Sequence, residues 1–250
     1  MTKNIQQGEC VVELNKIYNM DCIAGMAMIP DKSVDMILSD LPYGITGCRW
    51  DSLIPFDQLW VQYKRVIKDN GAIVLTAAQP FTTQLIMSNK NMFRYCWYWK
   101  KNYSTGYAFA KYQSMRCIED ICVFYKKAPT YNPQGLIKRG KPSVCRGRTS
   151  AKHGDDIYDI ATLSRDTISY YTNYPKNFLE VKGEHGLHPT QKPVELFRYM
   201  IETYTNPGEL VLDSCIGSGT TAVAAVRTGR NYIGFEIDTQ HYQTAVNRIE

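Results

Sequence analysis

The chain has 250 residues, of which 44% are hydrophobic and 21% are charged, an ordinary balance for one large globular domain or two small ones. It contains no apolar stretch near the ~20 residues needed to cross a bilayer, and its polar start lacks a signal-peptide core. We therefore expect a cytoplasmic protein without a membrane partner. The eight cysteines form no Cys-x-x-Cys pair, which indicates reduced thiols and no metal site.

Apolar periodicity in the first half of the chain predicts alternating strands and helices. In chain order these are a strand at Val11–Tyr18, a short helix near Ile23–Met28, a strand at Val34–Ser39, a helix at Phe56–Lys68 stopped by Asn70-Gly71, a strand at Ala72–Thr76, a helix at Phe81–Ser88, and strands at Phe93–Trp99 and Ile121–Tyr125. Frequent glycines and polar residues from Lys126 to His185 predict an irregular module.

Regular alternation returns in the last quarter of the chain. The pattern predicts a helix at Pro193–Tyr204, a strand at Leu210–Asp213, a helix at Thr220–Thr228, a strand at Asn231–Ile237 and a helix at Thr239–Ile249. Strands that alternate with helices in both ordered blocks indicate an α/β fold, with a mostly parallel sheet and helices on both faces.

The turn Asp40-Leu41-Pro42-Tyr43 follows the predicted strand Val34–Ser39. Pro42 ends the strand because it has no N–H to donate, and the carboxyl ends of strands are where open α/β sheets bind ligands. Tyr43 can stack on a planar ring, while Asp40 and the Leu41 carbonyl accept hydrogen bonds from an exocyclic amine. Acceptors placed in this way leave the amine lone pair free to attack an electrophile. An ordinary turn with one exposed acid is the alternative.

A second motif runs from Leu210 to Thr221 as strand, glycine loop and helix. Gly217 and Gly219 allow a ligand to approach the backbone, and the helix start offers N–H groups to a carboxylate. Glu236, at the end of the next strand, can accept both hydroxyls of a ribose.

The same loop also fits the relaxed dinucleotide fingerprint Gly217-x-Gly219-x-x-Ala222, so an NAD-dependent oxidoreductase is a competing interpretation. Asp213 argues against it, because a carboxylate beside the loop repels a pyrophosphate and attracts an ammonium group.

The net charge of +5 conceals a strongly basic segment. Residues 94–152 hold 13 Lys or Arg and two acids, a net charge of +11, which leaves −6 on the rest of the chain. Aromatic residues are interleaved with these charges. This pattern favours a nucleic-acid-binding surface over a solvated charged face with its aromatic residues in the core. The residues expected among the DNA contacts are Lys100, Lys101, Arg116, Arg146 and Arg148.

Taken together and in this order, the turn at 40–43 and the run Asp213…Gly217-Ser218-Gly219-Thr220-Thr221 resemble the DNA amino-methyltransferases of the β class. His188-Pro189-Thr190-Gln191-Lys192-Pro193 resembles the motif that precedes the cofactor loop in that class, and Asn19-Met20-Asp21-Cys22 resembles its early acidic motif. The stretch Gly44–Asp51 resembles small phage-borne members. The resemblance covers about three-quarters of the chain, everything outside roughly 101–185.

The resemblance implies a Rossmann-like S-adenosylmethionine-dependent methyltransferase fold with permuted motif order. Its parts would be a catalytic half at 1–100, a target-recognition insertion at 101–185 and a cofactor half at 186–250. The implied activity is site-specific methylation of adenine N6 in double-stranded DNA by base flipping, in a restriction-modification setting of a bacterial or phage-infected cell. Asp40 at the head of the turn favours adenine N6. Cytosine N4 stays open, as do a non-catalytic nucleic-acid-binding module and a homodimer.

The resemblance also implies roles for individual residues. The target base would be held by Asp40, Leu41, Pro42 and Tyr43. In the cofactor site, Asp21 would lie at the adenine and Glu236 at the ribose, and Cys22 would be a further cofactor residue. The remaining cofactor residues, mostly around the methionine moiety, would be His188, Thr190, Lys192, Asp213, Cys215, Gly217, Ser218, Gly219, Thr220 and Thr221. Two departures from the family pattern are Leu41, in place of the usual first proline, and Cys215, in place of an aromatic residue beside the cofactor.

Overall fold

The computed structural model describes residues 4–7, 10–44, 52–146, 166–184 and 191–249. By packing, the chain forms two compact units: Met1–Asn132 with Asn177–Glu250, and Pro133–Lys176. Residues 101–132 and 177–184 therefore pack with the larger unit, although we expected them in the recognition insertion. The functional division at 100 and 185 stays a prediction.

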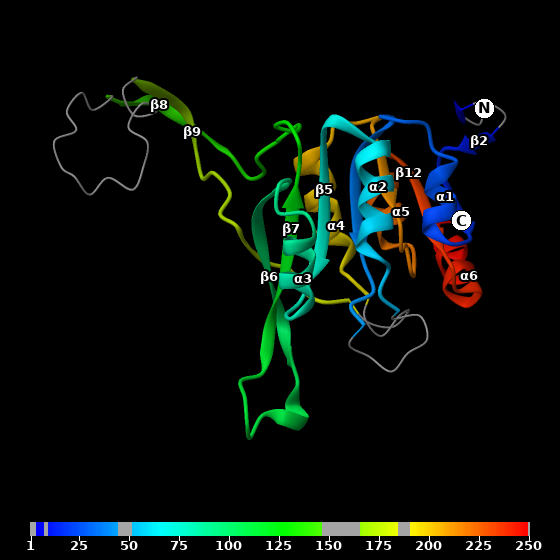
Figure 1. Cartoon of the computed structure of the whole chain (residues 1–250). Coiled ribbons are helices and arrows are strands. Elements are labelled where there is room, and N and C mark those ends of the chain that lie inside the picture. The colour runs from blue at the N-terminus through cyan, green and yellow to red at the C-terminus, as the bar shows by residue number, and fades with distance from the viewer. Residues whose placement is uncertain (1–3, 8–9, 45–51, 147–165, 185–190, 250) are drawn as a thin grey trace. The chain divides into compact units, whose positions relative to one another are not determined.

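The larger unit is built on an eight-stranded sheet with the order β10-β6-β7-β5-β4-β11-β12-β3 (Figure 1). Only β7 runs antiparallel to its neighbours in this sheet, which confirms the predicted mostly parallel α/β fold. In chain order the strands are β3 Lys16–Asn19, β4 Val34–Asp40, β5 Ile67–Ala77, β6 Phe93–Thr105, β7 Arg116–Phe124, β10 Phe178–Glu180, β11 Leu210–Asp213 and β12 Asn231–Glu236.

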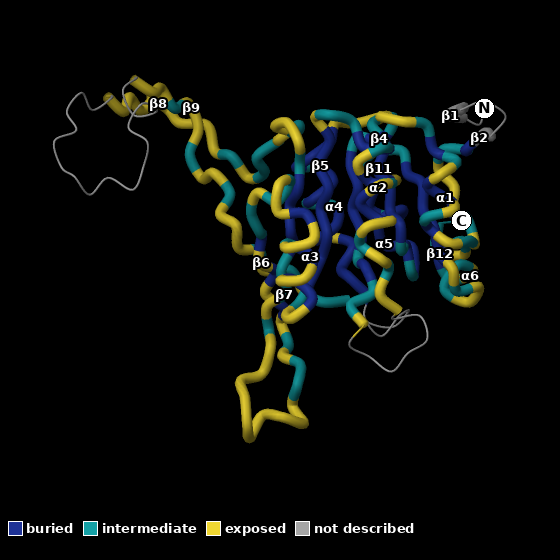
Figure 2. Tube along the Cα trace, in the orientation of Figure 1, coloured by how far each residue is buried: buried dark blue, intermediate teal, exposed yellow. Residues whose placement is uncertain are grey.

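Helices cover both faces of this sheet. They are α1 Cys22–Ala27, α2 Phe56–Val66, α3 Phe81–Ser88, α4 Val194–Tyr204, α5 Thr220–Arg227 and α6 Thr239–Asn247. One apolar core holds α1 to α3 together with Ile37 of β4, and the other holds α4 to α6 together with Met36 and Leu38. Successive residues of a strand face opposite sides, so the central strands are buried on both faces (Figure 2).

Two predicted elements differ from the structure near the start of the chain. The strand predicted at 11–18 is divided into β2 Cys10–Glu13, which pairs with β1 Asn4–Gln7, and β3, because Asn15 turns the chain with a φ of 61°. The helix predicted to stop at Asn70-Gly71 ends at Val66, and both residues lie in β5. A Cβ at Gly71 would lie 2.7 Å from the Asp35 carbonyl oxygen, so this glycine allows close approach of β4 and does not end a helix.

The smaller unit contains an antiparallel pair, β8 Ile137–Cys145 and β9 Thr167–Thr172. The prediction of an irregular module was wrong for these residues. Every residue of β8 is exposed, so no buried face imposes the apolar alternation by which a strand is detected in a sequence.

Candidate active site

A cavity of about 940 Å³ lies at the carboxyl edge of the sheet, within the larger unit. It is lined by residues that end or follow four parallel strands: Asp21 after β3, Asp40 on β4, Asp213 on β11 and Glu236 on β12. The volume is in the range that encloses ligands of nucleoside size or larger. The sequence motifs, which are far apart along the chain, are therefore brought together by the topology, as expected for an open α/β sheet.

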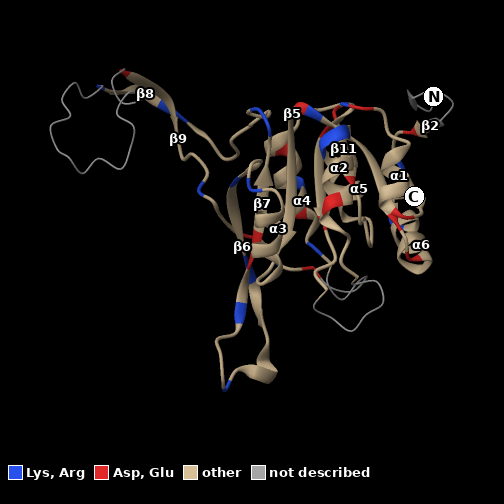
Figure 3. Ribbon diagram, viewed as in Figure 1, with Lys and Arg blue, Asp and Glu red and all other residues tan. Residues whose placement is uncertain are grey.

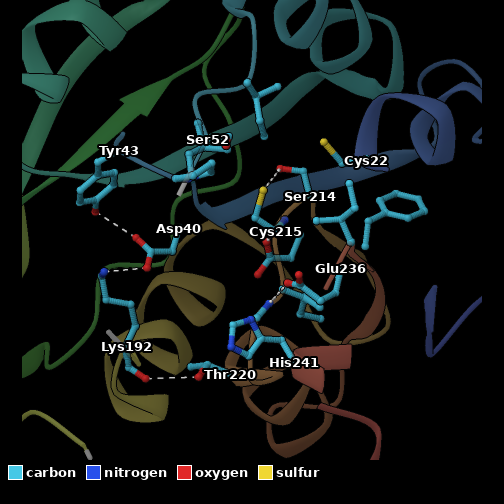
Figure 4. A pocket seen from close by; sticks show the side chains of 18 of the residues that line it. Cys22, Asp40, Tyr43, Ser52, Lys192, Ser214, Cys215, Thr220, Glu236 and His241 are labelled. Atoms are coloured by element: carbon cyan, nitrogen blue, oxygen red, sulfur yellow. Dashed lines mark hydrogen bonds and ion pairs between the residues drawn. The ribbon is translucent and has the colours of Figure 1, made fainter. Parts of the chain in front are cut away.

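The turn at 40–43 begins where β4 ends, and the carboxylate of Asp40 is held on both oxygens. Asp40 Oδ1 accepts hydrogen bonds from the Tyr43 hydroxyl at 2.9 Å and from the Thr76 hydroxyl, and Oδ2 lies 2.7 Å from Lys192 Nζ. In Figure 4, Tyr43 and Lys192 both point toward Asp40. The Tyr43 ring stacks on Phe81 with centroids 4.9 Å apart. The turn thus presents a fixed carboxylate beside a fixed aromatic ring.

The pKa of the Tyr43 hydroxyl is raised well above its usual value, first by burial and then by the negative charge of Asp40. Tyr43 therefore remains a neutral hydrogen-bond donor to Asp40 over the physiological pH range.

Lys192 belongs to a chain of alternating charges in the cavity wall, which consists of Asp40, Lys192, Glu119 and Lys101. Its Nζ lies 3.4 Å from Glu119 Oε2, and Glu119 also pairs with Lys101 at 2.8 Å. Burial alone would lower the pKa of Lys192, but Asp40, Tyr43 and Glu119 outweigh it and raise that pKa well above its usual value. Burial likewise would raise the pKa of Glu119, whereas Lys192 and Lys101 lower it. Lys192 and Glu119 therefore remain ionised, and the two acids of this charge chain balance its two lysines.

Lys192 lines the cavity, as the resemblance implies for a cofactor residue. Its ammonium is directed at Asp40 of the turn at 40–43. Its backbone is beside the cofactor loop, since the Thr220 hydroxyl donates to the Lys192 carbonyl at 3.3 Å. Lys192 thus joins the two halves of the site.

Lys101 was expected among the DNA contacts, but it does not lie at the surface. It is 7% exposed. Lys101 lies on the same face of β6 as the buried Trp97 and Trp99, because residues two apart on a strand share a face. Lys100 lies on the other face of the strand, where it is exposed and pairs with Glu180 at 2.9 Å. Arg116 is exposed at the start of β7 and lines the cavity, and Arg146 is exposed after β8. Arg148 lies outside the described residues.

Asp213 fixes the start of the cofactor loop. It is 2% exposed and accepts hydrogen bonds from Ser39 Oγ at 2.5 Å, from the Cys215 N–H at 3.0 Å and from the Thr221 hydroxyl. Burial raises the pKa of Asp213 to about 6, although the hydrogen bonds from Ser39, Thr221 and Cys215 oppose the rise. The carboxylate therefore ties β11 to β4 and to its own loop.

Glu236 fixes the other side of the loop. Its Oε2 accepts from the Gly217 N–H and its Oε1 from the Asp238 N–H, both at 2.9 Å. Gly217 has a φ of 54°, and a Cβ there would meet no atom within 4 Å. The backbone at Gly217 is therefore open to a ligand, with a buried carboxylate beside it.

Asp21, Cys22 and Cys215 also line the cavity. Asp21 is the N-cap of α1 and accepts from the Ala24 N–H at 3.0 Å. A hydrogen bond with Cys22, together with burial, raises the pKa of the Cys215 thiol well above its usual value. The Cys215 thiol therefore remains protonated at neutral pH and presents sulfur, not an aromatic face, to the cavity.

Most of the predicted cofactor residues line this one cavity. They are Asp21, Cys22, Lys192, Asp213, Cys215, Gly217, Ser218, Thr220 and Glu236. Gly219 and Thr221 do not line it: Gly219 is the N-cap of α5 with a φ of 84°, and Thr221 binds Asp213. His188 and Thr190 lie outside the described residues.

Sequence reasoning missed the contribution of β6 and β7 to the cavity. Trp99, Tyr103 and Glu119 line it, and Thr76 of β5 binds Asp40. The alternation Trp97, Trp99, Lys101 was the available signal, because residues two apart on a strand share a face. No local pattern marks Glu119 or Thr76.

Within the described part of the chain, no three His, Cys, Asp or Glu side chains gather as a metal site. None of the helices described there is long and apolar enough to cross a membrane.

The raised pKa of Asp213 predicts a pH-dependent stability. The pKa of Asp213 is about 6 in the folded protein, against an ordinary 3.8. The stabilising contribution of this carboxyl is therefore complete below pH 3.8 and is lost as the pH rises through about 6. The contribution amounts to about 3 kcal/mol, because a tenfold change in an ionisation equilibrium corresponds to about 1.4 kcal/mol. The free energy of unfolding of wild type, minus that of Asp213→Asn, should therefore fall by most of that amount, about 2 kcal/mol, between pH 4 and pH 7.

Urea unfolding of both proteins at several pH values measures this difference. Asp57→Asn, at an exposed acid of α2, is the matched control and should show a flat difference. A flat or rising difference for Asp213→Asn would contradict the prediction.

Comparison with known proteins points to one family. A family model described as DNA methylase matches residues 34–247. The type II methyltransferase M1.MboII of Moraxella bovis is 27% identical over 262 residues, which covers 96% of this chain and 99% of that protein. The DNA adenine methyltransferase YhdJ of Escherichia coli (strain K12) is 27% identical over 269 residues, which covers 95% of this chain and 83% of that one.

Two solved structures share the fold. The crystal structure of the M1.HpyAVI–SAM complex has a TM-score of 0.62 at 24% identity and covers 93% of this chain and 98% of its own. The cytosine-N4-specific PvuII DNA methyltransferase has a TM-score of 0.67 at 15% identity, with 94% and 86% covered. At these identities the likeness concerns the fold alone.

Proposed function

The chain belongs to the DNA methylase family, and on that premise we propose that it transfers the methyl group of S-adenosylmethionine to N6 of adenine in double-stranded DNA. One observation carries the proposal. The acceptor turn at Asp40 and the open glycine loop at Gly217 line the same cavity, so a base amine and a methyl donor can meet there.

The residues around the glycine loop fit S-adenosylmethionine. Each oxygen of Glu236 accepts one backbone N–H and keeps lone pairs for the two ribose hydroxyls. Gly217 leaves room for the methionine moiety, with Asp213 beside the loop and Asp21 at the adenine end. When bound, this cofactor supplies a methyl group on a positively charged sulfur.

At the catalytic turn, the protein would act on the amine of a flipped adenine. Asp40 and the Leu41 carbonyl accept its two N–H groups, and Tyr43 stacks on the ring. The buried ammonium of Lys192, 2.7 Å from Asp40, holds the carboxylate in one orientation. Preorganised acceptors of this kind stabilise the positive charge that develops on the amine as it is methylated.

A labelling experiment tests the proposal. Incubation of purified protein with plasmid DNA and S-adenosylmethionine that carries a radioactive methyl group should give radioactivity in the acid-precipitated DNA. Calorimetry should show binding of S-adenosylmethionine and none of NAD. NAD binding would favour the oxidoreductase, and absence of any cofactor binding, even with DNA present, would favour a non-catalytic DNA-binding module.

Binding to DNA should weaken steeply with salt, because Lys and Arg displace counterions from phosphates. The triple variant Lys100→Glu, Arg116→Glu, Arg146→Glu should bind DNA less tightly, and its plot of log affinity against log salt should be shallower by about two to three. Its affinity for S-adenosylmethionine should not change. Fluorescence anisotropy with labelled duplex at several salt concentrations measures the slope.

The matched control reverses three exposed charges on or next to helices, Lys64, Lys90 and Arg227. It should keep more of the wild-type slope than the triple variant does. An affinity of the wild type that does not depend on salt would contradict this prediction.

A further inference from the structure

The hairpin formed by β6 and β7 projects beyond the rest of the sheet (Figure 1). Since β7 is antiparallel to both β5 and β6, β6 runs parallel to β5 and leaves the sheet at the edge that carries the catalytic turn. The stem of the hairpin also forms part of the cavity wall through Trp99, Lys101, Tyr103, Thr105, Arg116, Ile118 and Glu119.

The tip of the hairpin, residues 105–116, carries three exposed aromatic rings. Tyr107 is 82% exposed, Phe109 60% and Tyr112 87%, and the projecting segment stands out as exposed in Figure 2. The tip is nevertheless folded. The Phe109 N–H donates to the Gly106 carbonyl at 3.0 Å, and the Tyr112 N–H donates to the Phe109 carbonyl at 2.9 Å. The rings are therefore presented on a defined turn, where packing within the chain does not account for them.

The charge of the tip favours a polyanion as its partner. Residues 105–116 contain Lys111 and Arg116 and no acid, and Figure 3 shows Lys and Arg on the projecting part. A second copy of this chain packed tip to tip would bring like charges together, which disfavours that contact.

We propose that the tip of the β6–β7 hairpin enters the target duplex and stacks an aromatic side chain in the space that the flipped base leaves. This inference rests on the proposed function, since it requires a base to leave the helix. An extruded base leaves its neighbours and its partner unstacked, and aromatic side chains on a basic support compensate by stacking.

The distance along the chain fits this role. Thr105 lines the cavity, and Tyr107 follows two residues later, at most about 7 Å along the chain. This is about two base-pair steps of ~3.4 Å. The same two strands therefore form part of the cavity wall and present the exposed rings close to it.

The experiment compares two substrates after the recognition site has been mapped on DNA methylated by wild type. The first is an intact duplex. The second has an abasic site opposite the target adenine, so the adenine leaves the helix without breaking a base pair. The triple variant Tyr107→Ala, Phe109→Ala, Tyr112→Ala should methylate the intact duplex about 10- to 100-fold more slowly than wild type. On the abasic duplex it should come within about threefold of wild type.

Base flipping is measured separately with 2-aminopurine at the target position. Wild type should raise its fluorescence in the intact duplex, and the triple variant should not. Single variants identify the stacking ring, and Phe or Trp at that position should restore the signal. Met87→Ala and Val226→Ala remove exposed apolar side chains elsewhere and should match wild type on both substrates.

Three results would overturn the inference: full activity of the triple variant on the intact duplex, an equal loss on both substrates, or a changed oligomeric state in sedimentation without a flipping defect. A wild type that methylates no DNA would instead contradict the proposed function. Anisotropy with labelled duplex would then still test the tip, because the triple variant should bind DNA less tightly than wild type if the tip enters the duplex, and equal binding would overturn the inference.

Discussion

Asp40→Asn is expected to lower the turnover number about 100- to 1000-fold, the loss typical of removing one preorganised group that faces the developing charge. The amide keeps the shape of the carboxylate but has one acceptor oxygen in place of two. It cannot accept from Thr76, Tyr43 and Lys192, as Asp40 does, and still hold the amine of the base. Single-turnover methylation of DNA measures the effect.

The same variant should bind S-adenosylmethionine within about threefold of wild type, since in the proposed function Asp40 holds the base and Glu236 holds the cofactor. Calorimetry provides this comparison, and Asp57→Asn, at an exposed acid, should leave both quantities unchanged. Normal turnover by Asp40→Asn would show that the turn is not catalytic.

Lys192→Met is expected to lower the free energy of unfolding by about 3 to 5 kcal/mol, the usual loss when one member of a buried ion pair is removed. Asp40 and Glu119 would remain in the cavity wall with only Lys101 as a cationic partner. The Lys192 side chain is 7% exposed, so solvent screens this loss little. Turnover should also fall at least about tenfold, because Asp40 loses the donor that orients it.

Chemical denaturation measures the loss of stability. The pKa of Lys192 lies well above its usual value when folded, so its contribution is complete below the ordinary lysine pKa and is lost only as the pH rises through the folded value. The loss in Lys192→Met should therefore be constant from pH 6 to pH 9. Adding Glu119→Gln should restore part of the stability, and Lys64→Met, at an exposed lysine, should match wild type. A stability of Lys192→Met equal to that of wild type would show that the charge chain is not a source of stability.

The parts of the site that could be predicted from the sequence are those whose residues are contiguous in the chain. Strand, proline turn and aromatic ring occur together at 34–43, and strand, glycines and helix occur together at 210–227, so local rules place both motifs at the carboxyl edge of a parallel sheet. The placement of Asp40, Gly217 and Glu236 around one cavity agrees with that expectation.

The charge chain could not be predicted in this way. Lys192, Glu119 and Lys101 come from a loop and two neighbouring strands, and nothing in their own segments fixes which side chains meet. The overall charge of residues 94–152 suggested a surface role for Lys101, but strand alternation with Trp97 and Trp99 outweighs composition. A comparison of every second residue from 97 to 101 would have placed Lys101 on the buried face of the strand, with the two tryptophans.

The helix end expected at Asn70-Gly71 failed for a related reason. Asn-Gly is a common stop for a helix, but the close pairing of β4 and β5 also requires a residue without a side chain at Gly71. The same dipeptide serves either purpose, and only the tertiary contact decides between them.

The most direct test of the proposed function is nucleoside mass analysis of DNA treated with the purified protein and S-adenosylmethionine that carries a deuterated methyl group. Wild type should place the deuterated methyl in N6-methyldeoxyadenosine and in no other nucleoside. Asp40→Asn, run beside it, should give at most about one hundredth of that product in the same time. Deuterated N4-methylcytosine would move the target to cytosine. Absence of deuterium from every nucleoside, with folded wild type and bound cofactor, would contradict the assignment of this cavity as a methyl-transfer site.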